Sequence, residues 1–466
     1  MTILLAAVNA RFTHASPVLR YLRNAIEAVF KEMGGQAGSG TAKPGAIILR
    51  EYHIGQNRLE IARDMALAAP DVLLLSVYIW NAELISAILP DLRAMLPGCR
   101  LILGGPEAAY NAGAWLAAHP ELDLVVSGEG ETAVTVLARA GFSTEAYPDR
   151  LMIAPPVDFS AVPMPYRAED FKALEHRYLY YESSRGCPFA CSYCLSSRSD
   201  HGLRFKPATL VKAELDGIVA TRPMLVKFVD RTFNADKARA REIWSHLIRE
   251  HSGSGSRFHF EVHPALLGFD DFALLEQAPD GLFQFELGVQ TIHERTRAAI
   301  HRTGDWSREK EAIQRLIALG TVHIHLDMIV GLPYEGMAEV GASFEELSGL
   351  GAGHFQIGFL KGLPGTELRK RAGEYGMAFQ SAPPYTVLYS SALSARELAA
   401  LARLEELYDN IGNTGKYRPE MEKAAAFHGG SFAAYLALSG FCINTGFDIR
   451  TRNEVKIREL LGAWLQ

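Results

Sequence analysis

The sequence predicts an α/β protein in three parts: a doubly wound, Rossmann-like sheet, a partial (β/α)6 barrel, and a mostly helical C-terminal region. Apolar runs of strand length alternate with amphipathic stretches up to about residue 360, a pattern typical of βαβ units and parallel sheets. Four prolines between 154 and 166 interrupt it and indicate a domain boundary. We therefore expect domains at 1–150, 179–365 and 366–466, with a linker at 151–178.

The first domain carries five expected strands and three expected helices. The strands are at 3–8, 46–52, 72–78, 100–103 and 122–127, and the helices are at 16–33, 59–67 and 82–96. The glycine-rich stretch 34–45 indicates a loop. A doubly wound sheet binds its ligand beyond the carboxyl ends of its strands, so the segments that follow these strands are the candidate binding loops.

Six further strands follow the proline-rich segment, at 179–184, 225–230, 258–262, 283–289, 323–330 and 355–360. Six strands with intervening helices suit an open (β/α) barrel, in which chemistry lies at the carboxyl ends of the strands. After residue 366 the pattern becomes helical, most clearly at 394–410.

Composition excludes several classes of protein. The 466 residues carry a net charge of −6 and 48% hydrophobic residues, so nucleic acid is not an expected partner and ordinary cores can form. No apolar run approaches the length of a membrane span, and the N-terminus lacks the charged region of a signal peptide. Five cysteines without a framework spacing fit a reducing cytoplasm.

Cys187, Cys191 and Cys194 form a C-x3-C-x2-C motif directly after the first barrel strand. Three thiolates at this spacing can ligate three irons of a 4Fe–4S cluster and leave the fourth iron open for a small molecule. Two alternatives stay open: a structural zinc with His201 as the fourth ligand, and a disulfide with a spare thiol, which a reducing compartment disfavours. The isolated Cys99 and Cys442 fit small buried hydrophobes better than ligands.

The cysteine loop, with Tyr193 before its last cysteine, resembles the cluster loop of radical S-adenosylmethionine (SAM) enzymes. The N-terminal half resembles the cobalamin-binding domain of the cobalamin-dependent class. The phrases that carry this second resemblance are Asn9-Ala-Arg-Phe-Thr-His-Ala-Ser-Pro17, Ser76-Val-Tyr-Ile-Trp-Asn81, Gly104-Gly-Pro-Glu107 and Ser127-Gly-Glu-Gly-Glu131. Together they cover nearly the whole chain, which most resembles an uncharacterised subgroup with a C-terminal domain of unknown function.

The resemblance implies that SAM chelates the open iron and that the reduced cluster cleaves it to methionine and a 5′-deoxyadenosyl radical, while the protein positions the groups. The expected SAM contacts lie at or after the ends of barrel strands: Glu261, Gln290, Arg302 and Asp327. The Arg302 guanidinium suits the methionine carboxylate. Asp230 and Arg231 are expected near SAM or the substrate. An acidic residue at a strand end can instead cap the next helix.

In the first domain the resemblance implies contacts with cobalamin. The expected residues are Asn9, Thr13, Ser76, Tyr78, Asn81, Gly104, Gly105, Glu107, Gly128, Glu129 and Gly130. Glycines allow close approach of the backbone to a ligand, although these glycines can equally serve tight turns. The usual cobalt-ligating Asp-x-His-x-x-Gly motif is absent, because His53 stands in Glu51-Tyr-His-Ile-Gly55, and the lower cobalt ligand is therefore unassigned.

The resemblance as a whole implies a cobalamin-dependent radical SAM enzyme that methylates or rearranges an unactivated carbon of a small molecule, with an electron donor such as flavodoxin or ferredoxin. Two other hypotheses stay open: a radical SAM enzyme without cobalamin, and a non-enzymatic, zinc-stabilised cobalamin carrier. His323 and His325 alternate on one strand and fit hydrogen-bonded structural residues better than a metal pair. Tyr385, Tyr389 and Tyr417 are candidate substrate contacts in the C-terminal region.

Overall fold

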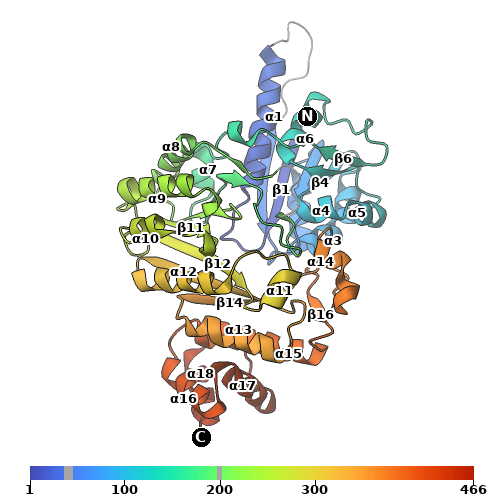
Figure 1. Ribbon diagram of the computed structural model, residues 1–466. Helices are drawn as coiled ribbons and strands as arrows, with labels where there is room; N and C mark the ends of the chain where they lie inside the picture. The colour runs from blue at the N-terminus through green and yellow to red at the C-terminus, as the bar shows by residue number, and fades with distance from the viewer. Residues whose placement is uncertain (36–45, 197–201) are drawn as a thin grey trace.

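The computed structural model describes residues 1–35, 46–196 and 202–466, which form two parallel sheets and a helical C-terminal region (Figure 1). The loop expected at 34–45 lies almost entirely outside these residues. No single helix among them is long and apolar enough to cross a membrane; one pair of helices, Arg418–His428 and Ser431–Thr445, bent by 100°, passes that test by length and composition only.

The first sheet has six parallel strands in the order β2-β1-β3-β4-β5-β6. Its strands are β1 (Ile3–Asn9), β2 (Ile47–His53), β3 (Val72–Ser76), β4 (Arg100–Gly104), β5 (Leu124–Gly128) and β6 (Leu151–Ala154). β6 pairs with β5, so the sheet extends four residues into the segment expected to be a linker. The strand order reverses between β1 and β3, and the crevice at such a switch point is where open α/β sheets bind ligands.

Helices cover both faces of this sheet. The alternation of side chains along β1 puts Leu4, Ala6 and Val8 into one core and Ile3, Leu5 and Ala7 into the other. The first core is closed by α2 (Arg58–Leu67), α3 (Ala82–Met95) and α5 (Ala112–Ala118), and the second by α1 (Pro17–Gly35) and α6 (Gly130–Arg139). The doubly wound, Rossmann-like arrangement predicted from the sequence is confirmed.

The second sheet also has six parallel strands, in the order β14-β13-β12-β11-β10-β7. They are β7 (Leu179–Tyr181), β10 (Leu225–Phe228), β11 (Arg257–Glu261), β12 (Phe283–Gln290), β13 (Val322–Val330) and β14 (His354–Phe359). Because β7 and β14 do not pair with each other, the barrel is open, and the partial (β/α)6 barrel predicted from the sequence is confirmed.

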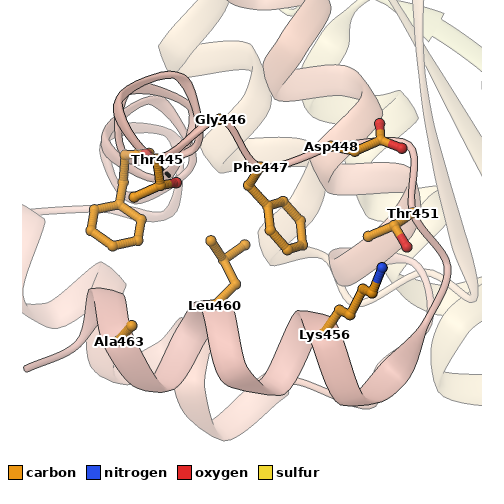
Figure 2. A pocket seen from close by; sticks show the side chains of 9 residues that line it. Thr445, Gly446, Phe447, Asp448, Thr451, Lys456, Leu460 and Ala463 are labelled. Atoms are coloured by element: carbon orange, nitrogen blue, oxygen red, sulfur yellow. Dashed lines mark hydrogen bonds between the residues drawn. The ribbon is translucent and has the colours of Figure 1, made fainter.

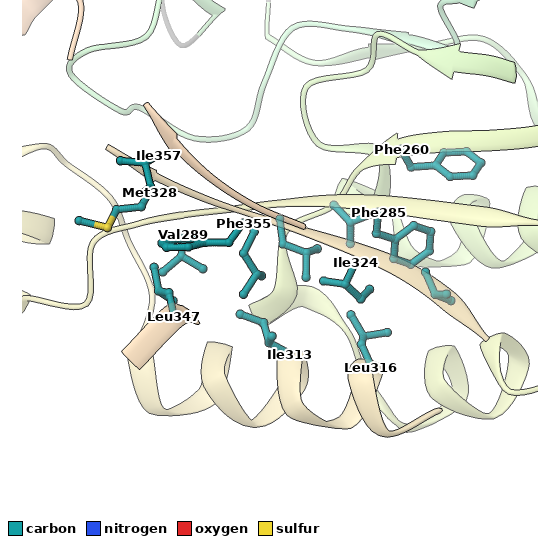
Figure 3. Close-up of a cluster of buried hydrophobic side chains, with 14 of the residues drawn as sticks. Phe260, Phe285, Val289, Ile313, Leu316, Ile324, Met328, Leu347, Phe355 and Ile357 are labelled. Carbon is teal, nitrogen blue, oxygen red and sulfur yellow. The ribbon is translucent and has the colours of Figure 1, made fainter. Parts of the chain in front are cut away.

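Alternating burial along these strands gives the barrel two different faces. On β12, Phe283, Phe285, Leu287 and Val289 are buried, whereas the residues that alternate with them are only partly buried. The apolar side chains pack outward against α12 (Trp306–Leu319), where Ile313 and Leu316 meet them (Figure 3). The helices α8 (Ala208–Val219), α9 (Lys237–His251), α10 (Phe269–Leu275) and α13 (Met337–Gly349) complete this outer layer. The residues that alternate with these apolar side chains point to the inner face of the barrel, where we look for a functional site.

The C-terminal region packs on α13 through aromatic side chains. Phe344 of α13 lies 5.2 Å from Tyr408 and 5.6 Å from Phe432, ring centre to ring centre. The region contains β15 (Ala378–Phe379), β16 (Val387–Tyr389), α15 (Ala395–Leu407), α16 (Arg418–His428), α17 (Ser431–Thr445) and α18 (Glu454–Trp464). A pocket of about 510 Å³ opens between α17 and α18, lined by residues such as Phe447 and Lys456 (Figure 2). It lies outside both sheets.

Candidate active site

The cysteine loop follows β7 and lies between β8 (Ser184–Arg185) and β9 (Arg204–Phe205), which pair as a two-stranded antiparallel ribbon. Gly186, just before the first cysteine, has φ +101°, and a Cβ there would lie 2.4 Å from the Gly202 carbonyl oxygen. Only glycine fits this turn without strain. Within the loop, the Ser192 amide donates to the Ile300 carbonyl at 2.9 Å, and the Ser192 carbonyl accepts from the Leu368 amide at 2.9 Å. The barrel and the C-terminal region thus both hold the loop.

Cys187, Cys191 and Cys194 are partly buried, and no disulfide bond joins them in the described part of the chain. Burial raises the pKa of the Cys191 thiol; Arg302 opposes this shift, and the charges of Cys194 and Cys187 add to it. Such mutual influence requires the three thiols to be close together. Three neighbouring thiols that are open to solvent suit a cluster. The alternative fourth zinc ligand, His201, lies outside the described residues.

Asp230 supports the approach to this loop. Its carboxylate accepts hydrogen bonds from the Ser183 amide at 2.9 Å and from the hydroxyls of Ser183 and Ser184, both at 2.6 Å. Because Asp230 is fully buried and saturated by the chain, it fixes the strand before the cysteines. We expected it near SAM or the substrate, and that proximity stays a prediction beside this structural role.

The four expected SAM residues converge at the carboxyl end of the barrel. Glu261, Gln290 and Asp327 end or nearly end the neighbouring strands β11, β12 and β13. A bulge between Gly288 and Gln290 gives Gln290 φ +71°, and bulges re-aim side chains next to active sites. Arg302 donates to the Gly288 carbonyl from the loop after α11 (Glu294–Ala299), so it joins the same group.

This group carries unusual protonation states. Burial, followed by the charges of Glu286 and Glu261, raises the pKa of Asp327 to about 8. Burial also raises the pKa of Glu261 to about 7, against the opposing charge of Arg231, 3.4 Å away. At neutral pH the inner barrel therefore holds a neutral carboxyl on Asp327 beside the ionised Glu286. Perturbed carboxyls grouped at strand ends are typical of functional sites.

Several polar atoms in this group are buried and have no hydrogen-bond partner within the described chain. They are Gln290 Oε1, Arg302 Nε and Asp327 Oδ1. Buried polar groups in folded proteins are normally satisfied, so these atoms are available to a polar ligand. An amide oxygen, a guanidinium and a neutral carboxyl match the amino, carboxylate and hydroxyl groups of SAM in kind. The residues therefore fit that cofactor.

His263 and Phe189 belong to the same region and escaped the sequence analysis. Their rings stack with centres 4.5 Å apart, which places a barrel residue against the cysteine loop. Burial, and then the charges of Arg302 and Arg297, lower the pKa of His263 to about 3, so the imidazole is neutral. Its only signal in the sequence is its position two residues after Glu261.

The carboxyl ends of β3 and β4 form the candidate cobalamin surface. The rings of Tyr78 and Trp80 stack with centres 4.3 Å apart and an interplanar angle of 8°, and the Trp80 side chain is 45% exposed. The Ser76 hydroxyl oxygen is buried and lacks a partner among the described residues. A Cβ on Gly104 would meet open space, whereas one on Gly105 would lie 2.6 Å from the Val77 carbonyl oxygen. The backbone of the protein therefore requires glycine at 105, whereas the space over Gly104 is open.

Two asparagines expected to contact cobalamin have their side chains occupied within the protein. The Asn81 amide group donates to the carbonyls of Val8 and Ser76 at 2.9 and 3.1 Å, and its oxygen accepts from the Tyr78 amide at 2.8 Å. The Asn9 amide group donates to the His14 carbonyl and the Glu51 carboxylate. Both residues therefore shape the binding loops. Thr13 acts through its backbone carbonyl, which accepts from the Tyr178 amide at 2.8 Å.

The loop after β5 joins the two domains. Glu129 pairs with Arg204 and Arg185, and its carboxylate also accepts from the Val157 amide at 2.7 Å. A Cβ on Gly128 would meet the Ala154 carbonyl oxygen at 2.2 Å, and one on Gly130 would meet Leu22 at 2.9 Å. Glu129 therefore holds the first domain to the β8–β9 ribbon, while Gly128 and Gly130 allow close packing within the first domain. Contact of these three residues with cobalamin stays a prediction.

A cavity of about 660 Å³ connects the two sheet ends. Tyr78, Trp80 and Glu107 line it from the first domain, and Cys194 and Arg231 line it from the barrel. Residues after β14, including Lys361 and Pro364, close a further side. A group bound over β3 and β4 therefore shares one chamber with the cysteine loop.

Comparison with known proteins identifies the parts of the chain. Residues 181–347 match the model of the Radical SAM superfamily, residues 46–138 match a B12 binding domain, and residues 373–465 match a protein of unknown function, DUF4080. The barrel thus matches the Radical SAM superfamily, with a match to a B12 binding domain before it and a match to DUF4080 after it. These domains imply a 4Fe–4S cluster, SAM and cobalamin as cofactors.

Two curated relatives are methyltransferases. The 2-(S-pantetheinyl)-carbapenam-3-carboxylate methyltransferase of Streptantibioticus cattleyicolor is 25% identical over 344 residues, covering 66% of this chain and 50% of that protein. The cobalamin-dependent radical SAM methyltransferase TokK of Streptomyces tokunonensis is 25% identical over 297 residues, covering 57% of this chain and 43% of that protein. The chain thus spans about half the length of these relatives.

Two solved structures share the fold. OxsB, a cobalamin-dependent SAM radical enzyme solved with aqua-cobalamin and SAM bound, matches with a TM-score of 0.68 at 13% identity, over 99% of this chain and 78% of that chain. TsrM from Kitasatospora setae, solved with cobalamin and a [4Fe-4S] cluster, matches with a TM-score of 0.62 at 16% identity, over 82% of this chain and 78% of that chain. At these identities the likeness concerns the fold.

Proposed function

We propose that the protein is a cobalamin-dependent radical SAM enzyme that methylates an unactivated carbon of a small molecule. One observation carries the proposal: a single cavity is lined by Cys194 and Arg231 of the barrel and by Tyr78 and Trp80 of the first domain. Two cofactors bound at separate surfaces would not need a common chamber. The methyltransferase relatives support methyl transfer as the reaction. An electron donor such as flavodoxin or ferredoxin is part of the proposal, because cleavage of SAM consumes an electron.

When bound, the cluster supplies the electron that cleaves SAM to methionine and a 5′-deoxyadenosyl radical, and cobalamin supplies a methyl group. The protein's own residues bind and orient SAM, and they exclude water from the site. Arg302 offers its guanidinium to the SAM carboxylate, and Asp327, kept neutral by burial and Glu286, donates or accepts a hydrogen bond at the nucleoside. Gln290 completes the set with its unpartnered amide oxygen.

Anaerobic SAM cleavage tests the barrel half of the proposal. Cluster-loaded wild-type protein with a chemical reductant should form 5′-deoxyadenosine, and Cys191→Ala should abolish it because one iron ligand is lost. The matched control is Cys442→Ala, which removes a buried thiol of α17 and should retain SAM cleavage. If Cys191→Ala still forms 5′-deoxyadenosine, the barrel does not act through this cluster.

Cofactor dependence tests the first-domain half. With SAM carrying a labelled methyl group, added cobalamin should allow the label to pass to an acceptor, while formation of 5′-deoxyadenosine requires the cluster alone. Label transfer that is unaffected by cobalamin would favour a radical SAM enzyme without that cofactor. Stoichiometric zinc in place of iron in anaerobically purified protein would favour the non-enzymatic carrier.

A further inference from the structure

Three metal-ligating side chains meet on the outer surface of the barrel. Asp216 stands on α8, and His246 and His251 stand on α9 (Figure 1). Asp216 Oδ1 is 2.6 Å from the Nε2 atom of His246 and 2.6 Å from that of His251. All three ligand atoms lie within 4.8 Å of one another. We propose that these side chains form a binding site for a divalent transition-metal ion of the zinc type.

The donor set suits such an ion. Two imidazoles and one carboxylate are common zinc ligands, with Zn–N and Zn–O distances of about 2.0 to 2.2 Å. Tetrahedral ligands at those distances stand about 3.3 Å apart, so Asp216 Oδ1 needs to move less than about 1 Å from each imidazole nitrogen to admit the ion. In the metal-free arrangement both imidazoles donate a proton to the same carboxylate oxygen, and the ion replaces these two protons.

The surroundings favour a cation with one open position. The Asp216 side chain is 50% exposed and leaves room for water as a fourth ligand, whereas both histidine side chains are only 12% exposed. The two rings stand 5.4 Å apart at 77°, so packing holds them. The nearest interhelical pair, Lys212 with Glu242 at 2.6 Å, lies one helical turn earlier on both helices. Its lysine charge is paired with the glutamate.

The site has a structural consequence. An ion held by one ligand on α8 and two on α9 fastens the two helices that flank β10, the strand next to β7. β7 leads into the cysteine loop, so the ion would brace the edge of the open barrel that carries the cluster. A metal that binds the folded chain stabilises it by mass action.

Zinc titration of the cluster-loaded protein, with any affinity tag removed, tests the proposal. Loading the cluster first keeps zinc away from Cys187, Cys191 and Cys194. We expect wild-type protein to compete with a chromophoric chelator for about one zinc per chain, and to gain thermal stability as zinc is added. The double variant Asp216→Asn/His246→Gln should bind zinc more than about tenfold more weakly and lose this gain, because two of three ligands are gone.

The matched control is Lys212→Met/Glu242→Gln, which removes an interhelical polar pair on the same face and keeps the ligands. It should bind zinc as the wild type does. Iron content and SAM cleavage should be equal in all three proteins, which shows that each is folded and that the result is independent of the proposed enzymatic function. Zinc affinity that is the same in the double variant and the wild type, or a wild type that binds no zinc, would overturn the proposal.

Discussion

The hydroxyl of Tyr385 donates a hydrogen bond to the carboxylate of Glu107, although 278 positions separate the two residues. Tyr385 lies between β15 and β16 and is 2% exposed, and Glu107 lies in the first turn of α4 (Pro106–Tyr110) and is 4% exposed. Burial raises the pKa of Glu107, and the hydrogen bond from Tyr385 opposes that shift. The contact therefore fastens the C-terminal region to the wall of the shared cavity.

Loss of this contact should cost stability. Tyr385→Phe removes one of the side-chain donors to a buried carboxylate, and we expect the free energy of unfolding to fall by about 1 to 2 kcal/mol in urea denaturation. The control Tyr389→Phe alters a side chain that is 50% exposed, and its effect should stay within about 0.5 kcal/mol. Equal effects of the two variants would show that the Tyr385–Glu107 contact is not a stabilising one.

Removal of the Arg302 guanidinium should weaken SAM binding. Arg302→Ala should lower the affinity of the cluster-loaded protein for SAM by about 10- to 100-fold in calorimetry, because a charge-assisted hydrogen bond is lost. The SAM affinity of Arg302→Lys should lie between those of the wild type and Arg302→Ala. Lysine keeps the positive charge but lacks the planar guanidinium that can form two parallel hydrogen bonds. The control Arg295→Ala removes an exposed arginine that lies over the Tyr334 ring and should bind SAM normally. Wild-type affinity in Arg302→Ala would place the SAM carboxylate elsewhere.

Asp327 should make stability depend on pH. Its pKa is raised to about 8 in the folded protein, so the folded state keeps a proton that the unfolded chain releases above about pH 4. Stability should therefore fall as the pH rises through this window, and Asp327→Asn should remove about 3 to 4 kcal/mol of that fall between pH 5 and 8. Because the pKa of Glu261 is also raised, Glu261 adds to the fall in stability with rising pH. The Asp327→Asn variant keeps this contribution.

Urea denaturation across pH 5 to 8, without SAM, measures this slope. Asp149→Asn, which changes an exposed carboxylate, is the control and should follow the wild type. An Asp327→Asn protein whose stability falls as steeply as that of the wild type would show that Asp327 is ionised in the folded state.

Most of the fold could be predicted because the strands of both sheets are continuous or alternating apolar runs. β6 escaped because it has only four residues, Leu151–Ala154, followed directly by Pro155 and Pro156. Local pattern gives little weight to so short a segment, and only its pairing with β5 makes it a strand. The linker was therefore expected to begin too early.

The site residues that could be predicted are those whose place in the fold follows from their position at the end of a strand. Gln290, Asp327 and Glu261 lie at strand ends, and parallel strands bring their carboxyl ends to one edge. What could not be predicted is which polar atoms the protein itself satisfies. Glu129 meets Arg185 and Arg204 from another domain, and Tyr385 meets Glu107 rather than a substrate. Such partners depend on how the domains pack.

The partners of several histidines also could not be predicted from the sequence. His325, on β13, lies 2.7 Å from the side-chain nitrogen of Gln284, a neighbour that only the sheet register supplies. The group of Asp216, His246 and His251 was missed because its members are 30 and 35 positions apart in sequence and meet only when α8 and α9 pack side by side.

Cobalt and iron content after anaerobic loading with iron, sulfide and cobalamin tests the shared cavity most directly. A Cβ at Gly104 meets open space, as it does at Gly98 near the opposite end of β4, so the fold should tolerate leucine at either position. We predict about four irons per chain and one cobalamin for the wild type and for Gly98→Leu, but iron without cobalt for Gly104→Leu. A wild type that takes up iron and no cobalt, or a Gly104→Leu protein that keeps its cobalt, would contradict the account.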